Sequence, residues 1–291
     1  GQHKICEITR DLRGQVVIVT GASTGVGKET ARTLARMGAT IILACCDVDE
    51  ASAVVEKLKQ DTQNDKIEFI EMDLADLKSI KKFADEFKRK YNKLNLLINN
   101  AGVMAIPERQ ETKDGFEYIF GVNYLGHFYL NDLLLDLLKK TAPSRIINLS
   151  SSYSQYGKIN WDDLMSERSY IVPNVYSQSK LSVLTSTKYL QKKLQNDNIK
   201  VVAVHPGVVF SNLTRDVVRK YYFRFVPSLS FLADSFIKGF GKTPVEGAQT
   251  SLYCALEDFN KLVDGGFYAD CRIKEENPEA LDEKNQLRLW E

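Results

Sequence analysis

Short apolar runs alternate with longer amphipathic segments along most of the chain. Seven runs are candidate strands, at 15–20, 39–44, 66–71, 94–99, 145–150, 199–204 and 265–270. Apolar runs of this length, bounded by turn residues, are typical of strands that are buried on both faces of a parallel sheet. The pattern therefore predicts an α/β fold, a doubly wound parallel sheet of about seven strands flanked by helices.

The segments between these runs carry apolar residues at helical spacing. Helices are predicted over 28–37, which ends before Gly38, over 77–91, from Tyr176 toward 195, and from near Pro244. No repeat, low-complexity tract or linker divides the chain. We therefore expect a single domain over 1–291, with its core at about 14–270 and a C-terminal tail at 271–291.

One insertion, at about 212–241, departs from the alternation. Its sequence YYFRFVPSLSFLADSFIKGF, at 221–240, is too apolar for a solvated loop and too interrupted for a core strand. It is either an extra helix pair packed on the domain or a lid over an apolar substrate, and the two interpretations are compatible. We expect peripheral membrane contact or docking to involve 221–240.

Composition narrows the class of protein. The 291 residues are 44% hydrophobic and 26% charged, as in ordinary soluble proteins. The 39 basic and 38 acidic residues leave a formal charge of +1 with no basic stripe, so nucleic acid is not an expected partner.

The five cysteines lack the spacing of a zinc site or a disulfide framework. Reduced cysteines indicate an intracellular, reducing compartment, which is the cytosol, a microsomal membrane surface or the mitochondrion. His3, His127 and His205 are isolated in the sequence, so no metal site is predicted.

A glycine-rich turn, TGASTGVG at 20–27, follows the first predicted strand and opens the first helix. Its glycines let the backbone approach a pyrophosphate, whose charge meets the amides of the helix N-terminus. A nucleoside-triphosphate loop is the competing interpretation because Lys28 follows Gly27. That loop needs four residues between its first glycine and the Gly-Lys pair, whereas five intervene here and Glu29 follows.

The sequence YSQSK, at 176–180, places Tyr176 and Lys180 on one helix face. A neighbouring ammonium favours the phenolate form of a tyrosine, so the pair could exchange a proton with an alcohol or carbonyl oxygen. The same segment holds Ser177-x-x-Lys180, the spacing of a serine acylase. The Lys-Thr-Gly and Ser-Asp-Asn partners of that chemistry are missing from the sequence, which weakens the alternative.

The order of these motifs is more specific than any one of them. The series contains TGxxxGxG at 20–27, Asp73-Leu74, NNAG at 99–102, Asn123, SSS at 150–152, YxxxK at 176–180 and Pro206-Gly207. This series resembles the short-chain dehydrogenase/reductase family over about residues 14–270. The phrases TGASTGVGKETA, LLINNAGVM, GVNYLGHF, YSQSKL, HPGVV and KTPVEGAQTSLYCAL resemble its retinol dehydrogenase-like branch.

The resemblance implies a Rossmann-like fold and a catalytic role for four residues. Tyr176 would donate or accept the proton, and Lys180 would lower the pKa of Tyr176 and hold the nicotinamide ribose. Ser151, the second serine of the motif, would orient the substrate oxygen. Asn123 would hold a water that links Lys180 to solvent.

The resemblance also implies where the dinucleotide binds. Asp73 would meet the adenine edge, the NNAG turn would pack beside the adenosine, and Pro206 would pass the nicotinamide carboxamide. The expected cofactor-binding residues, besides Tyr176 and Lys180, are Gly21, Ser23, Thr24, Gly25, Val26, Gly27, Cys46, Asp73, Leu74, Asn100, Ala101, Gly102, Pro206 and Gly207.

The choice between NAD and NADP depends on LACCDVD at 43–49. Where NAD-using members carry an acidic residue this chain has Cys45, and where the branch carries an arginine for the 2′-phosphate it has Cys46. Thr24 is neutral at the other common basic position, and Asp47 would repel a phosphate. Lys28 or Arg32 could compensate, so both cofactors stay open, with a slight preference for NADP from the resemblance.

Two functions follow. The first is an NAD(P)-dependent oxidoreductase that interconverts a lipophilic alcohol, such as a retinoid, a steroid or a long-chain alcohol, with its aldehyde or ketone. The second is a non-enzymatic dehydrogenase-fold subunit or cofactor sensor in a larger assembly, which the altered specificity position favours. A homodimer is an expected assembly of the first.

Overall fold

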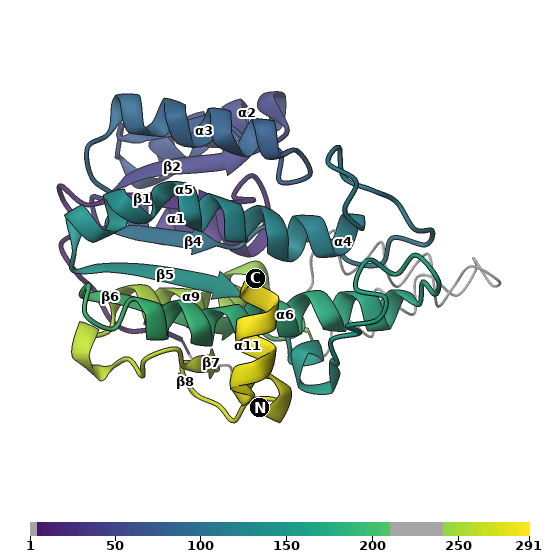
Figure 1. The fold of residues 1–291 in the computed structure, drawn as a ribbon. Helices are drawn as coiled ribbons and strands as arrows, with labels where there is room; N and C mark the ends of the chain where they lie inside the picture. Colours follow the sequence, from purple (N-terminus) through teal and green to yellow (C-terminus); the bar gives the residue numbers. More distant parts are fainter. Residues whose placement is uncertain (1–4, 210–240) are drawn as a thin grey trace.

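Eight strands form one sheet in the order β3-β2-β1-β4-β5-β6-β7-β8 in the computed structural model, which describes residues 5–209 and 241–291 (Figure 1). The strands are β1 (Val16–Thr20), β2 (Thr40–Cys45), β3 (Ile67–Glu71), β4 (Leu96–Asn99), β5 (Ser144–Leu149), β6 (Ile199–His205), β7 (Phe267–Ala269) and β8 (Arg272–Ile273). The first seven run parallel, which confirms the predicted fold class.

The predicted count of about seven strands is one short. The additional strand, β8, pairs antiparallel with β7 at the sheet edge. Asp270 and Cys271, which connect the two strands, both have positive φ, at 52° and 55°. A two-residue exposed strand has no hydrophobic period, so the sequence pattern could not predict it.

Helices cover both faces of the sheet. They are α1 (Gly25–Arg36), α2 (Val48–Thr62), α3 (Leu77–Lys90), α4 (Tyr118–Phe120), α5 (Gly126–Thr141), α6 (Val172–Lys193), α9 (Pro244–Leu256), α10 (Pro278–Leu281) and α11 (Glu283–Trp290). A π-helix, η1 (Gly121–Leu125), and two 3₁₀ helices, η2 (Ser152–Tyr156) and η5 (Phe259–Lys261), complete the described elements. The helices α5 and α6 lie in front of the sheet in Figure 1.

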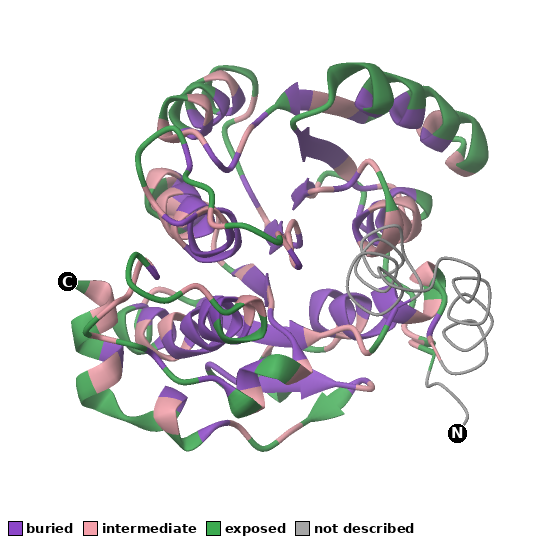
Figure 2. Ribbon diagram, turned by 90° about the vertical axis from the view of Figure 1, so that its right-hand side faces the viewer, coloured by how far each residue is buried: buried purple, intermediate pink, exposed green. Residues whose placement is uncertain are grey.

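The side chains of β1 show why the strand sequences are apolar throughout. Val17 and Val19 pack into a core shared with α1, α2 and α9, while Val16 and Ile18 pack into a second core shared with α3, α5 and α6. All five residues of β1 are buried. Figure 2 shows the same division: the strands are mostly buried, and exposed residues gather on the outer helix faces.

Local signals fix the helix ends close to the predicted positions. Asp76 caps α3 by accepting hydrogen bonds from the backbone N–H groups of Lys78 and Ser79. Gly38 follows α1 with a φ of +91°, as a C-terminal glycine does. The helix α1 begins three residues earlier than predicted because the last part of the glycine-rich turn forms its first turn.

The C-terminal tail forms two helices that pack on the domain. The ring of Trp290 in α11 lies 4.9 Å from the ring of Phe128 in α5 and 5.1 Å from that of Tyr189 in α6. The expected lid at 212–241 lies outside the described residues, apart from Gly241. Within the described ranges, no helix is both long enough and apolar enough to cross a membrane.

Candidate active site

The carboxyl ends of the central strands open into one cleft, with a volume of about 680 Å³. Parallel strands bring residues that are distant in sequence to the same sheet edge, and this is where α/β proteins bind ligands. Of the residues expected to bind cofactor or act in catalysis, all line the cleft except Gly27 and Asn123.

The glycine-rich turn forms one wall. Gly21 and Gly25 have φ values of +61° and +57°, in the left-handed region that glycine favours. A Cβ on Gly21 would lie 2.8 Å from the backbone of Ala101, whereas a Cβ on Gly25 would meet nothing within 4 Å. The turn is therefore packed on its inner side and open at the start of α1, which suits a pyrophosphate at the helix N-terminus.

The NNAG turn is bonded to the glycine-rich turn. The hydroxyl of Thr20 accepts hydrogen bonds from the backbone N–H groups of Asn100 and Ala101, each at 3.0 Å. The Asn100 amide donates to the carbonyl oxygens of Thr20 and Gly21, at 3.0 and 3.2 Å. Gly27 does not line the cleft because it packs on this amide, which a Cβ at Gly27 would strike.

Tyr176 and Lys180 both reach the cleft from α6. The ammonium of Lys180 lies 5.9 Å from the centre of the Tyr176 ring and donates a 2.9 Å hydrogen bond to the carbonyl oxygen of Leu149. Burial lowers the pKa of Lys180 to about 8. Burial also raises the pKa of Tyr176 to about 12, against a smaller lowering by the Ser151 hydroxyl. The expected lowering of this pKa by Lys180 therefore stays a prediction.

The three serines after β5 have different partners. The Ser150 hydroxyl is buried and donates to the backbone oxygen of Lys180 at 2.8 Å. The Ser151 hydroxyl lines the cleft with Tyr176, lowers the pKa of that phenol slightly, and accepts from the N–H of Tyr153 at 3.2 Å. The structure thus places Ser151, the serine chosen from the sequence, beside the phenol.

Asn123 lies behind the cleft, in the π-helix η1. Its side chain accepts from the N–H of Val103 at 2.8 Å and donates to the Val103 carbonyl and the Ser179 hydroxyl, at 2.9 and 3.0 Å. These bonds fix the chain that follows the NNAG turn. π-Helical turns are rare and often occur at functional sites.

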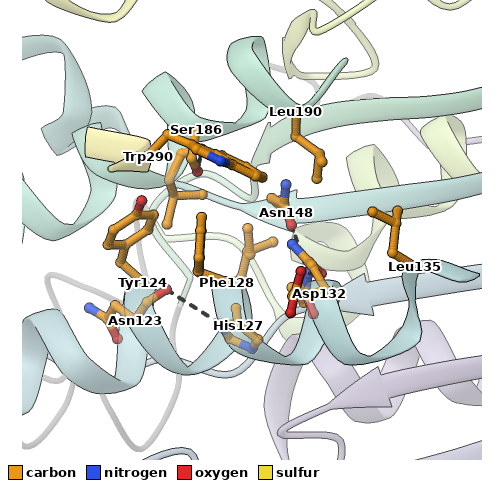
Figure 3. A pocket seen from close by; sticks show the side chains of 14 residues that line it. Asn123, Tyr124, His127, Phe128, Asp132, Leu135, Asn148, Ser186, Leu190 and Trp290 are labelled. Carbon is orange, nitrogen blue, oxygen red and sulfur yellow. Dashed lines mark hydrogen bonds between the residues drawn. The ribbon is translucent and has the colours of Figure 1, made fainter. Parts of the chain in front are cut away.

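A second, smaller cavity lies on the far side of Asn123, between α5 and α6 (Figure 3). Its volume of about 30 Å³ accommodates roughly one water molecule. His127, Asn148 and Trp290 are among the residues that line it, and the nearby Asn99 Oδ1 is buried without a hydrogen-bond partner among the described residues. No sequence pattern predicts this cavity, because Trp290 of α11 closes it from the end of the chain.

Two further residues of the cleft went unrecognised in the sequence. His205, treated as isolated, lines the cleft and accepts from the N–H of Gly207 at 3.2 Å. Burial lowers its pKa to about 4, so it is neutral. Cys45 also lines the cleft, and burial raises the pKa of its thiol to about 11.

Among residues 5–209 and 241–291, no three or more His, Cys, Asp or Glu side chains lie together in a way that could hold a metal ion.

Known proteins with similar sequences belong to the family that the motifs indicate. The family model described as short chain dehydrogenase matches residues 15–221. Retinol dehydrogenase 12 of Mus musculus is 42% identical over 286 residues, which cover 98% of this chain and 87% of that protein. Retinol dehydrogenase 14 of Homo sapiens is 39% identical, with 96% and 85% covered.

Solved structures agree with the fold. A protein from Mycobacterium paratuberculosis has a TM-score of 0.75 and 31% identity, with 98% of this chain and 93% of that chain covered. The L-sorbose reductase of Gluconobacter frateurii, solved with NADPH and L-sorbose, has a TM-score of 0.72 at 18% identity, with 89% and 96% covered, and shares the fold. The chain therefore belongs to the short-chain dehydrogenase/reductase family, in its retinol dehydrogenase-like branch, and is an NAD(P)-dependent oxidoreductase of alcohol or carbonyl groups.

Proposed function

We propose that this protein interconverts a lipophilic alcohol and its aldehyde or ketone, with Tyr176 as the acid–base group. The observation that carries the proposal is that Tyr176, Ser151 and Lys180 meet in one cleft with the glycine-rich turn. The cofactor, when bound, supplies or accepts the hydride at the substrate carbon. The protein's part is to orient the substrate oxygen and to move one proton to or from it.

The position of Ser151 and Tyr176 in the same cleft supports this division of roles. In reduction, the Ser151 hydroxyl holds the carbonyl oxygen while the Tyr176 hydroxyl donates its proton to that oxygen. In oxidation, Tyr176 takes the proton from the alcohol. Lys180, as an ammonium, stabilises the phenolate that remains after donation. Asn123 fixes the backbone of Val103 beside them and acts as a positioning residue.

The remaining cleft residues suit the two ends of a dinucleotide. Asp73 and Leu74 follow β3 and line the end of the cleft beside Cys46, where we place the adenine. Pro206 and Gly207 follow β6 and line the end beside Lys180, where we place the nicotinamide. Gly207 has a φ of +87° and packs against the Lys242 side chain, so this turn is held in place.

A lipophilic substrate suits the lining of the catalytic end. Val103, Met104, Val208 and Val209 contribute apolar surface, and Val208 is 62% exposed. The similar proteins named retinol dehydrogenase point to a retinoid as the first substrate to test. Steroid ketones and long-chain aldehydes present the same combination of one reactive oxygen and a large apolar body.

The test is turnover of retinal, decanal, a steroid ketone and, as a polar comparison, L-sorbose, each with NADH and with NADPH. Tyr176→Phe should lower kcat by about 10²–10⁴-fold, the usual contribution of a positioned acid–base group. Tyr156→Phe is the matched control, because Tyr156 is nearby in sequence and 85% exposed.

Turnover of L-sorbose alone would overturn the lipophilic substrate. Cofactor binding without turnover of any substrate would favour the non-enzymatic sensor or subunit instead.

A further inference from the structure

The helix α2 begins two residues after Cys46, which lines the adenosine end of the cleft together with the glycine-rich turn. Because β2 pairs with β1 in register from Thr40 to Ala44, the residues after β2 lie beside the turn after β1. The N–H of Gly21 donates to the Ala44 oxygen at 2.9 Å, and Cys46 lines the cleft and is exposed. A group on the adenosine ribose would therefore meet the beginning of α2.

The beginning of α2 is acidic. The Ser23 hydroxyl of the glycine-rich turn donates a 2.7 Å hydrogen bond to Glu50 Oε2. The carboxylate of Asp47 caps the helix and accepts from the N–H of Glu50 at 2.9 Å. The carboxylates of Asp47 and Glu50 are thus both held at the start of α2, and that of Glu50 is bonded directly to Ser23, which lines the cleft.

The negative charge near the start of α2 affects the pKa of the Cys46 thiol. Its pKa is raised by burial and by the carboxylates of Asp73, Asp47 and Glu50, which lie close enough to disfavour the thiolate. A phosphate placed near Cys46 would meet the same three negative charges.

Among residues 5–209 and 241–291, no lysine or arginine lines this end of the cleft. Arg32, considered from the sequence, forms ion pairs with Glu29 and Asp61. Lys28 does not line the cleft, and Lys180 is the one lysine or arginine among the described residues that do. Lys180 belongs to the catalytic end, next to Tyr176.

We propose that this cleft takes NAD in preference to NADP, and that Glu50, held by Ser23 and supported by Asp47, sets the preference. The inference rests on the proposed function and reverses the slight preference for NADP drawn from the resemblance. A carboxylate accepts hydrogen bonds from ribose hydroxyls and repels a 2′-phosphate, whereas a guanidinium at the Cys46 position would attract it.

The experiment is a fluorescence titration of the purified protein with NADH and with NADPH, in wild type, Glu50→Gln and Cys46→Arg. Glu56→Gln is the matched control, because it removes the same charge from α2 where the side chain pairs with Lys59 instead of Ser23. Wild type should bind NADH about tenfold more tightly, as one unfavourable charge contact predicts. Glu50→Gln and Cys46→Arg should each lower that ratio about threefold or more, mainly through tighter NADPH binding, and Glu56→Gln should leave it unchanged.

A second readout does not depend on any variant. Raising the salt concentration screens the repulsion, so the Kd for NADPH should approach the Kd for NADH. Equal or tighter binding of NADPH by wild type, or a ratio unmoved by Glu50→Gln and by salt, would overturn the inference and leave the proposed function standing. Binding of neither nucleotide would instead overturn the proposed function, and the inference with it.

Discussion

The hydroxyl oxygen of Thr20 lies 2.8 Å from Nε2 of His127, which joins the end of β1 to α5, the helix that directly follows the π-helix carrying Asn123. This hydroxyl already accepts from the N–H groups of Asn100 and Ala101, so its proton points to Nε2. The other ring nitrogen, Nδ1, then carries the hydrogen and donates to the Asn123 carbonyl at 3.3 Å. A neutral histidine thus ties the nucleotide-binding turns to the catalytic end.

Acidification should lower the stability of the fold through His127. Burial lowers the pKa of His127 from 6.5 to about 3, so between these values the unfolded chain binds a proton that the folded chain does not. The free energy of unfolding therefore falls as the pH falls, by about 2 kcal/mol at pH 5.

Urea unfolding at pH 7.5 and pH 5 measures this effect. His127→Gln removes the titrating group, so its loss of stability over this pH interval should be smaller than that of wild type. His205 is present in both proteins and cancels in the comparison. An identical pH dependence for the two proteins would contradict the assignment.

Titration of Lys180 should change the free energy of unfolding at alkaline pH. Its pKa is lowered from 10.5 to about 8 by burial, so between these values the unfolded chain again binds more protons. Stability without cofactor should therefore rise between pH 8 and 10.5 in wild type relative to Lys180→Met, by about 2–3 kcal/mol. The measurement is urea unfolding across this range, with Lys78→Met on the surface of α3 as control. If the difference in free energy of unfolding between wild type and Lys180→Met stayed constant across this pH range, the ammonium of Lys180 would not be desolvated.

The sequence predicted what depends on local pattern. Strands such as β1 could be predicted because both of their faces are buried, and the glycine-rich turn and YxxxK because their spacing alone defines the local geometry. The hydrogen bond from Ser23 to Glu50 and that between Thr20 and His127 span 27 and 107 residues. Such contacts depend on how the elements pack, and no periodicity in one segment reports them.

Two glycines of the turn should respond differently to alanine. Gly21→Ala places a Cβ 2.8 Å from the Ala101 backbone and keeps a φ of +61°, so it should destabilise the protein by about 2–3 kcal/mol. Gly25→Ala meets nothing within 4 Å and should cost only about 1 kcal/mol of strain. Both substitutions should weaken dinucleotide binding, because Gly21 and Gly25 both line the cleft. Thermal unfolding and cofactor titration separate the two effects, and equal destabilisation would argue against the packed inner side.

Trp290 should stabilise the fold from the end of the chain, because its ring packs between Phe128 and Tyr189 and lies under the ammonium of Lys193, 4.7 Å from its centre. Trp290→Ala should lower the free energy of unfolding by about 1–3 kcal/mol, less than for a fully buried tryptophan because the side chain is partly exposed. Leu287→Ala, on the exposed side of α11, should change it by less than about 0.5 kcal/mol. Since Trp290 also lines the small cavity beside Asn123, Trp290→Ala should open that cavity to solvent and speed hydrogen exchange of the backbone amides in η1. Unchanged exchange in η1 alongside lost stability would confine the role of α11 to packing.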